Sequence, residues 1–112
     1  MVKPVVTFKD FDRIDLRAGT VRDVQDLDGS SKLYRLTVDL GQEYGTRTIM
    51  AGVKPWYTKE EISGKQFIFV ANLEPRSMMG EESQGMIIAV ESDGKAVLLP
   101  VPDGVQDGAI LR

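Results

Sequence analysis

Apolar and polar residues alternate most clearly between residues 33 and 40. In the segment LYRLTVDL every second residue is apolar, namely Tyr34, Leu36, Val38 and Leu40, and the polar residues between them include Arg35. Because successive side chains of a β-strand point to opposite faces, this pattern predicts a strand with one buried and one exposed face. Arg35 is expected on the exposed face.

Two other segments predict the partners of this strand. Residues 14–24 mix apolar and charged residues around Gly19, which predicts a long strand that bends sharply at the glycine. After a loop bracketed by Gly41 and Gly45, residues 46–51 predict a strand that completes a hairpin. Arg47 is expected on the exposed face of this strand.

The second half of the chain contains nearly continuous apolar runs. Residues 66–72 and 85–92 predict two buried strands, and residues 73–84 between them predict a loop. The sequence at 92–95, Ser-Asp-Gly-Lys, predicts a tight turn into a last strand at 96–100. The sequence therefore predicts five or six strands in all.

Helices are expected to be short and few. Thr58 to Glu61 form a capping box, which predicts a short helix that ends near Gly64. Thr7 to Asp10 have the form of a helix start, which predicts a single turn that plugs one end of the core. The tail favours turns, and its apolar Ile110 and Leu111 are expected to cover the core or a partner.

These elements predict an all-β fold. A small bent antiparallel sheet with a short helix between its third and fourth strands matches a five-stranded OB-fold Greek-key barrel with extra N- and C-terminal elements. An SH3-like barrel is the alternative. No repeat or linker divides residues 1–112, so a single domain is expected. In OB folds, the face of strands 2 and 3 and the adjoining loops bind oligonucleotides.

Composition argues against an enzyme. The chain has no cysteine and no histidine, which removes disulfides, thiol catalysis, the commonest general base and the usual zinc ligands. No spacing of the 17 acidic residues singles out an acid/base pair. We therefore expect a binding protein without a cofactor or a metal site.

The apolar runs also bear on location. The longest, residues 67–71 and 86–90, fall well short of the roughly 20 residues that a membrane-spanning helix needs. The N-terminal residues include Lys3, Pro4 and Lys9 and lack the apolar stretch of a secretory signal. We therefore expect a cytoplasmic protein. The first methionine and the whole domain favour a separate gene product, and an excised domain is the alternative.

The charge is unevenly distributed. The formal net charge is −3, yet residues 32–80 carry seven basic and five acidic residues. This asymmetry is compatible with one basic face on an acidic body and equally with an ordinary solvated surface. Charge alone therefore permits nucleic-acid binding without indicating it.

Three cations belong to the predicted hairpin. Arg35 and Arg47 on its exposed face, with Lys32 at its entrance, could follow a phosphate backbone. The alternative is that the arginines pair with Asp39 or Glu43 across the hairpin, which contributes about 0 to 1 kcal/mol on a surface.

Other candidates lie outside the hairpin. Trp56 and Tyr57, next to Lys54, could stack on unpaired bases, although a lone tryptophan in a small barrel also suits the core.

The predicted loop at 73–84 and its flanks add a second set of polar residues. Asn72 and Gln84 could contact base edges, Arg76 a phosphate or a base, and Ser83 could hydrogen-bond. The alternatives are that Asn72 caps a strand end and that the methionines Met78, Met79 and Met86 fill gaps in the core.

Several motifs occur together in a characteristic order. These motifs are Asp15-Leu16-Arg17 with Gly19, Ser31-Lys32-Leu33, Val38-Asp39-Leu40-Gly41, Arg47-Thr48-Ile49, Ala51-Gly52-Val53, Asn72-Leu73-Glu74-Pro75-Arg76 and Glu82-Ser83-Gln84-Gly85-Met86. In these motifs and their order the sequence resembles the tRNA-binding domain family, which includes the C-terminal domain of many methionyl-tRNA synthetases, free-standing tRNA-binding proteins and an export-related chaperone.

The resemblance implies a function and a set of site residues. It implies an OB fold that binds tRNA by shape, usually as a homodimer, and assists methionyl-tRNA synthetase in trans or as its beta-type subunit. A peptide-binding chaperone of the same fold is the alternative. Ser77 departs from the family, because many relatives have a second basic residue there. The tRNA-binding residues implied here are Lys32, Arg35, Arg47, Asn72, Arg76, Ser83 and Met86.

Overall fold

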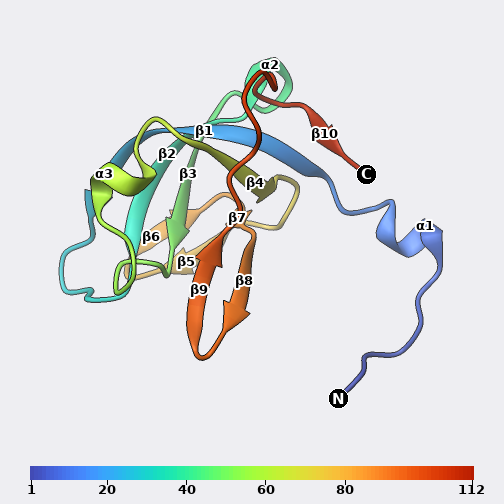
Figure 1. Cartoon of the computed structure of the whole chain (residues 1–112), viewed down its shortest axis with the longest axis horizontal. Coiled ribbons are helices and arrows are strands. Elements are labelled where there is room, and N and C mark those ends of the chain that lie inside the picture. Colours follow the sequence, from blue (N-terminus) through green and yellow to red (C-terminus); the bar gives the residue numbers. More distant parts are fainter.

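A computed structural model describes residues 1–112 (Figure 1). The chain forms ten strands and three four-residue helices. No helix is long and apolar enough to cross a membrane. In chain order, the elements are α1 (Phe8–Phe11), β1 (Leu16–Asp26), β2 (Tyr34–Asp39), α2 (Gly41–Tyr44), β3 (Thr46–Ala51), α3 (Lys59–Ile62), β4 (Gln66–Val70), β5 (Arg76–Met78), β6 (Glu81–Ser83), β7 (Met86–Ile87), β8 (Ala89–Ser92), β9 (Lys95–Leu98) and β10 (Ile110–Leu111).

The main sheet has the order β3-β2-β1-β4-β7, with β10 added along β1. The two outer strands are brought together by Gln84, whose backbone N–H donates to the carbonyl of Thr48 at 2.8 Å. The sheet is thereby curled into a nearly closed barrel, with α3 between β3 and β4 (Figure 1). The predicted five-stranded OB-type barrel is confirmed.

The core lies inside this barrel. The alternation of β2 is confirmed, because Tyr34, Leu36 and Val38 are buried and Arg35 lies on the partly exposed face. Side chains from other segments complete the core, and the largest fully buried ones include Phe69 of β4. Burying aliphatic and aromatic side chains is the main stabilising contribution in a domain of this size.

The curvature of β1 depends on a close approach at Gly19. A β-carbon there would lie 2.7 Å from Cδ2 of Leu40 and 2.9 Å from Cγ1 of Val38, so only glycine lets the neighbouring strand approach. The register with β2 shifts between Val21 and Asp23. β1 therefore pairs with β2, β4 and β10, as the predicted bend requires.

The helices agree only in part with the sequence pattern. The capping box of Thr58 and Glu61 is present at α3, as predicted. The predicted plug is wrong: Thr7 caps α1, but the helix extends away from the barrel and buries none of its residues (Figure 1). The expected loop at 41–45 contains the helical turn α2.

The region after β4 differs from the sequence-based expectation. Residues 73–84 were expected as a loop, yet they include the β5–β6 hairpin. Met79 and Gly80 both have positive φ, 52° and 81°, which suits the twist of a two-residue hairpin turn. The expected single strand at 85–92 is also divided, because β7 pairs with β4 whereas β8 forms a separate hairpin with β9.

Candidate nucleic-acid interface

Three of the predicted site residues line one hollow beside β3. We call it the hairpin pocket; it has a volume of about 380 Å³ and is lined in part by Met50, Leu73, Arg76, Ser83 and Met86. Arg76 and Met86 are exposed, whereas Ser83 lies at the base with 3% of its surface exposed. The β5–β6 hairpin and the start of β7 thus bring together residues that are adjacent in the sequence motif.

Ser83 and Gln84 hold the hairpin against β3. The hydroxyl of Ser83 accepts a hydrogen bond from the N–H of Met50 at 3.0 Å and donates one to the carbonyl of Gly85 at 3.1 Å. The side-chain carbonyl of Gln84 accepts from the N–H of Thr48 at 3.0 Å. These two side chains accept hydrogen bonds from backbone N–H groups of β3, where a paired strand would use its carbonyls. The hydroxyl of Ser83 therefore faces the protein.

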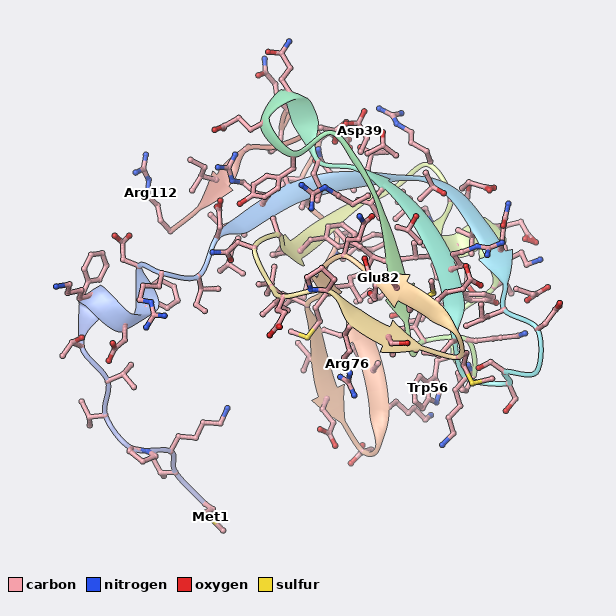
Figure 2. The ribbon with its side chains drawn as sticks, turned by 180° about the vertical axis from the view of Figure 1, so that it is seen from behind. Met1, Asp39, Trp56, Arg76, Glu82 and Arg112 are labelled. Atoms are coloured by element: carbon pink, nitrogen blue, oxygen red, sulfur yellow. The ribbon has the colours of Figure 1, made fainter.

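A second hollow adjoins the first at Gly52. We call it the Trp56 groove; it has a volume of about 700 Å³ and its lining includes Lys32, Gly52, Trp56 and Met79. Trp56 is 38% exposed, so it is not a core residue. Figure 2 shows Trp56 and Arg76 at the same end of the molecule, beneath the β5–β6 hairpin, with Asp39 at the opposite end.

Arg35 connects β2 to the hairpin. Its Nη1 lies 2.5 Å from a carboxylate oxygen of Glu81, and its other terminal nitrogen donates to the side chain of Gln25. The predicted pairing with Asp39 or Glu43 is wrong, because those carboxylates pair with arginines of β1. Glu81, 46 residues away in the chain, is the partner that the sequence did not reveal.

Arg47 and Asn72 lie outside both hollows. Arg47 donates from Nε to the carbonyl of Tyr44 at 3.0 Å, and its guanidinium carbon is 5.2 Å from the Tyr44 ring centroid. The amide of Asn72 accepts from the N–H of Asp15 and donates to the carbonyl of Arg13, each at 2.8 Å. Asn72 therefore fixes the start of β1. This agrees with the alternative role for Asn72, a residue that caps a strand end.

Lys54, the cation next to Trp56 and Tyr57 in the sequence, does not face either hollow. Lys54 lies 3.0 Å from a carboxylate oxygen of Asp26 and 3.3 Å from the carbonyl of Ser30. Tyr57 is half-buried, and its hydroxyl accepts from the N–H of Leu98 at 3.0 Å. Of the aromatic pair, only Trp56 lines the Trp56 groove.

A polar cluster at the opposite end of the barrel was not predicted. Arg17 is 7% exposed, and its guanidinium pairs with Asp15 at 2.7 Å and with Glu43 at 2.9 Å and donates to the carbonyl of Gly108 at 2.9 Å. The hydroxyl of Tyr44 donates to Asp15 at 2.6 Å. We call these residues the Arg17 cluster; they tie α2 and the tail to β1. The local pattern gave no signal that Arg17 is buried, because in a strand the apolar neighbours Leu16 and Ala18 point to the opposite face.

Ionisation in the Arg17 cluster follows from its hydrogen bonds. The pKa of Asp15 is lowered, mainly because its carboxylate accepts hydrogen bonds from Arg17. The same bond raises the pKa of Arg17, and the bond to Asp15 raises the pKa of Tyr44. The guanidinium, the carboxylate and the neutral phenol thus stabilise one another around neutral pH.

The two hollows offer binding groups rather than catalytic ones. Lys32 and Arg76 form no ion pair, and Trp56, Leu73, Met79 and Met86 expose apolar surface. No group of three or more acidic side chains in the chain is arranged to hold a metal ion. Free cations beside an exposed aromatic ring and adaptable methionines suit phosphates and unpaired bases, or apolar peptide segments.

Comparison with known proteins identifies relatives of this chain. Residues 16–109 match the family described as "Putative tRNA binding domain". The chain is 48% identical over 108 residues to a methionine–tRNA ligase of Pyrococcus horikoshii, which covers 96% of this chain and 14% of the ligase. The chain spans between 14% and 16% of the length of the curated ligases that it matches.

Solved structures share the whole fold. A MetRS related protein from Pyrococcus horikoshii has a TM-score of 0.92 and 38% identity, with 98% of this chain and all of that chain covered. A CsaA chaperone protein from Picrophilus torridus has a TM-score of 0.88 and 28% identity, with 96% and 100% covered. The family match extends over β1 to the tail and includes both hollows. The chain belongs to the tRNA-binding domain family.

Proposed function

We propose that this chain is a non-catalytic module that recognises tRNA largely by its shape and assists methionyl-tRNA synthetase, in trans or as a beta-type subunit. The observation that carries the proposal is the pair of cations without ion-pair partners, Lys32 and Arg76, on two hollows that meet at Gly52. Because the whole chain has a net charge of −3, a polyanion is expected to bind only at the face that carries these unpaired cations.

The seven predicted residues take two kinds of role in this proposal. Lys32, Arg76 and Met86 contact the RNA directly. Arg35 supplies positive charge beside the β5–β6 hairpin, and Arg47 supplies it farther along β3, next to Tyr44. Asn72 and Ser83 act by position, because their polar atoms are hydrogen-bonded within the chain. These two residues thus hold in place the segments that carry the direct contacts to base edges and phosphates.

A second copy of the chain is the proposed partner of the N-terminal arm. Residues 2–14 and the tail leave large apolar side chains in solvent, including Val5, Phe8, Phe11 and Ile110, with Phe8 76% exposed. Contiguous apolar surface of this kind is typical of an interface. In a symmetric dimer, each copy of this single-domain module of residues 1–112 would offer one contact face, so one tRNA could bind two faces at once.

The proposed place of action is the cytoplasm, where tRNA is used.

Titration of fluorescently labelled tRNA tests the proposal directly. With four contributing cations, we expect anisotropy to report salt-sensitive binding with a log–log slope of about −3, and thus about fiftyfold weaker affinity at 200 mM than at 50 mM salt. Absence of binding at 50 mM salt contradicts the proposal. A catalytic role would require aminoacylation or hydrolysis by the chain alone, which we expect to be absent.

A peptide-binding chaperone is the second candidate. The exposed methionines Met79 and Met86 and the exposed Leu73 favour it, because flexible thioethers adapt to varied apolar partners. Suppression of aggregation of an unfolded test protein should then survive the combined change of Arg35, Arg47 and Arg76 to alanine. Loss of that suppression in the triple variant would assign the apolar surface to RNA instead.

A further inference from the structure

Four segments that are distant in the sequence converge on the Trp56 groove. The β1–β2 connection contributes Lys32, the β3–α3 connection contributes Gly52 and Trp56, the tip of the β5–β6 hairpin contributes Met79, and the β8–β9 turn contributes Gly94. A β-carbon on Gly52 would meet no atom closer than 3.8 Å, so the groove is open where a side chain would otherwise stand. Its volume of about 700 Å³ is within the range of small-molecule sites.

The charge of this groove differs from that of two other hollows, the adjoining hairpin pocket and the hollow at the opposite end of the barrel. Lys32 is its only ionisable residue, and no acidic residue lines it. The hairpin pocket contains Glu74 beside Arg76, and the hollow at the Arg17 cluster contains Asp39, Glu43 and Asp107. A groove with a cation and no acid on an acidic chain favours an anionic occupant.

The backbone that carries the indole ring is held at the groove by hydrogen bonds. The N–H groups of Trp56 and Tyr57 both donate to the carbonyl of Val53, at 3.0 and 3.1 Å, which closes a tight turn. Tyr57 is in turn fixed to β2 by the bond from the hydroxyl of Tyr34 to its carbonyl at 2.7 Å. The backbone under Trp56 is therefore anchored to the barrel, while 38% of the residue remains exposed.

We infer that the Trp56 groove holds one unpaired nucleotide of the RNA, with its base stacked on the indole and its phosphate paired with Lys32. A base inside a duplex cannot reach the ring, because both of its faces are already stacked. The site therefore selects a loop or a single-stranded end. This inference rests on the proposed function and names the part of the RNA that this face would take.

The single tryptophan makes the site observable without a mutation. Trp56 is the only tryptophan of the chain, so selectively excited tryptophan fluorescence reports on the surroundings of this one ring. We expect a single-stranded eight-nucleotide oligoadenylate to quench it saturably, and a blunt RNA duplex of the same length to leave it unchanged at equal concentration. Quenching by an unfolded apolar peptide but not by the oligoadenylate would overturn the assignment.

Variants separate stacking from charge. Trp56→Ala should weaken oligoadenylate binding, measured by anisotropy of a labelled oligonucleotide, about tenfold or more, and Trp56→Phe should restore part of it while preserving the apolar contact. Lys32→Ala should weaken it several-fold and reduce the salt slope by about one. Lys65→Ala removes an exposed cation that does not line the groove and is the matched control.

A charge reversal provides a test that does not alter the ring. Ser31 also lines the groove and is exposed, so Ser31→Asp should repel the phosphate and weaken binding about tenfold, whereas Ser31→Ala should have no effect. Equal affinities of Ser31→Asp and Ser31→Ala would overturn the inference.

The outcomes distinguish this inference from the proposed function. If tRNA binds the wild-type protein but neither quenches Trp56 nor weakens with Trp56→Ala, the nucleotide site is wrong and the tRNA-binding function stands. If tRNA fails to bind at 50 mM salt, the proposed function is wrong. Quenching of Trp56 by the oligoadenylate then decides by itself whether the groove binds a nucleotide.

Discussion

The two ends of the barrel use arginine in opposite ways. At the end near α2, Arg17 is enclosed by two carboxylates, a carbonyl and an aromatic ring. At the other end, below the β5–β6 hairpin in Figure 2, Arg76 is exposed and forms no ion pair. The same side chain thus stabilises the fold where its donors are satisfied and is free for a ligand where they are not.

This difference predicts that changes at the two ends have separate consequences. Variants of the Arg17 cluster should alter the free energy of unfolding, whereas variants of the hairpin end should alter RNA affinity. Five substitutions test that separation, beginning with the largest expected effect.

Loss of Arg17 should be the most damaging change. Arg17→Ala removes a buried cation, leaves the carboxylate of Asp15 with only the hydroxyl of Tyr44, and leaves the carbonyl of Gly108 without its partner. We expect this to cost about 3 kcal/mol of unfolding free energy in urea. Arg22→Ala is the matched control, because Arg22 is largely exposed and its pairs with Asp39 and Asp107 are worth at most about 1 kcal/mol. Equal losses in both variants would contradict the comparison.

The carboxylate of the same cluster should make stability depend on pH. The pKa of Asp15 is lower in the folded state, so its contribution is complete above the unfolded pKa, near pH 4, and disappears as the pH falls through the folded value. Asp15→Asn should cost about 1.5 kcal/mol at pH 7 and flatten the decline of unfolding free energy between pH 5 and 2. Asp28→Asn, at an exposed turn, should leave the decline as it is.

Tyr44 should give the opposite dependence at high pH. Its pKa is raised in the fold, so its contribution is complete below the unfolded pKa and disappears as the pH rises through the folded value. The alkaline decline should be smaller in Tyr44→Phe.

At the hairpin end, Arg76→Ala should change binding without changing stability. We expect tRNA affinity to fall about fivefold and the salt slope to decrease by about one, with the urea midpoint unchanged. Lys65→Ala is the control for the loss of one positive charge. A shift of the urea midpoint with unchanged affinity would place Arg76 among the structural arginines.

The smallest effect should come from releasing Arg35. Glu81→Gln removes the carboxylate that faces Arg35, and the freed guanidinium should raise tRNA affinity about threefold. Glu82→Gln removes one negative charge from the adjacent residue of β6, which forms no ion pair, and measures the general effect of charge. If the tRNA affinities of the two variants rise equally, the ion pair with Glu81 does not restrain Arg35.

Local patterns were sufficient to predict the barrel. The alternation around Leu36, the glycine at 19 and the capping box at Thr58 each depend on residues close in the sequence, and each is present. The hairpin at 76–83 was missed because its strands are only three residues long and polar. The Met79-Gly80 pair, with glycine where a positive φ is needed, was the available signal.

The partners of the candidate residues could not be predicted from the sequence. Arg35 meets Glu81 across 46 residues, and Asn72 meets Asp15 across 57, so no local pattern relates them. The exposure of Trp56 is likewise a consequence of how four distant segments meet. Motif order identified a set of residues, but dividing them into proposed contact and positioning roles required the fold.

The β5–β6 hairpin is attached to the barrel by side chains, and Ser83 is its only buried residue. A segment with so little buried surface opens at a small fraction of the global unfolding free energy. Its amide protons should therefore exchange with solvent much faster than those of β1, β2 and β4. One wall of the proposed RNA-binding surface can thus move on its own, which would let the protein meet differently curved tRNA surfaces while the barrel stays fixed.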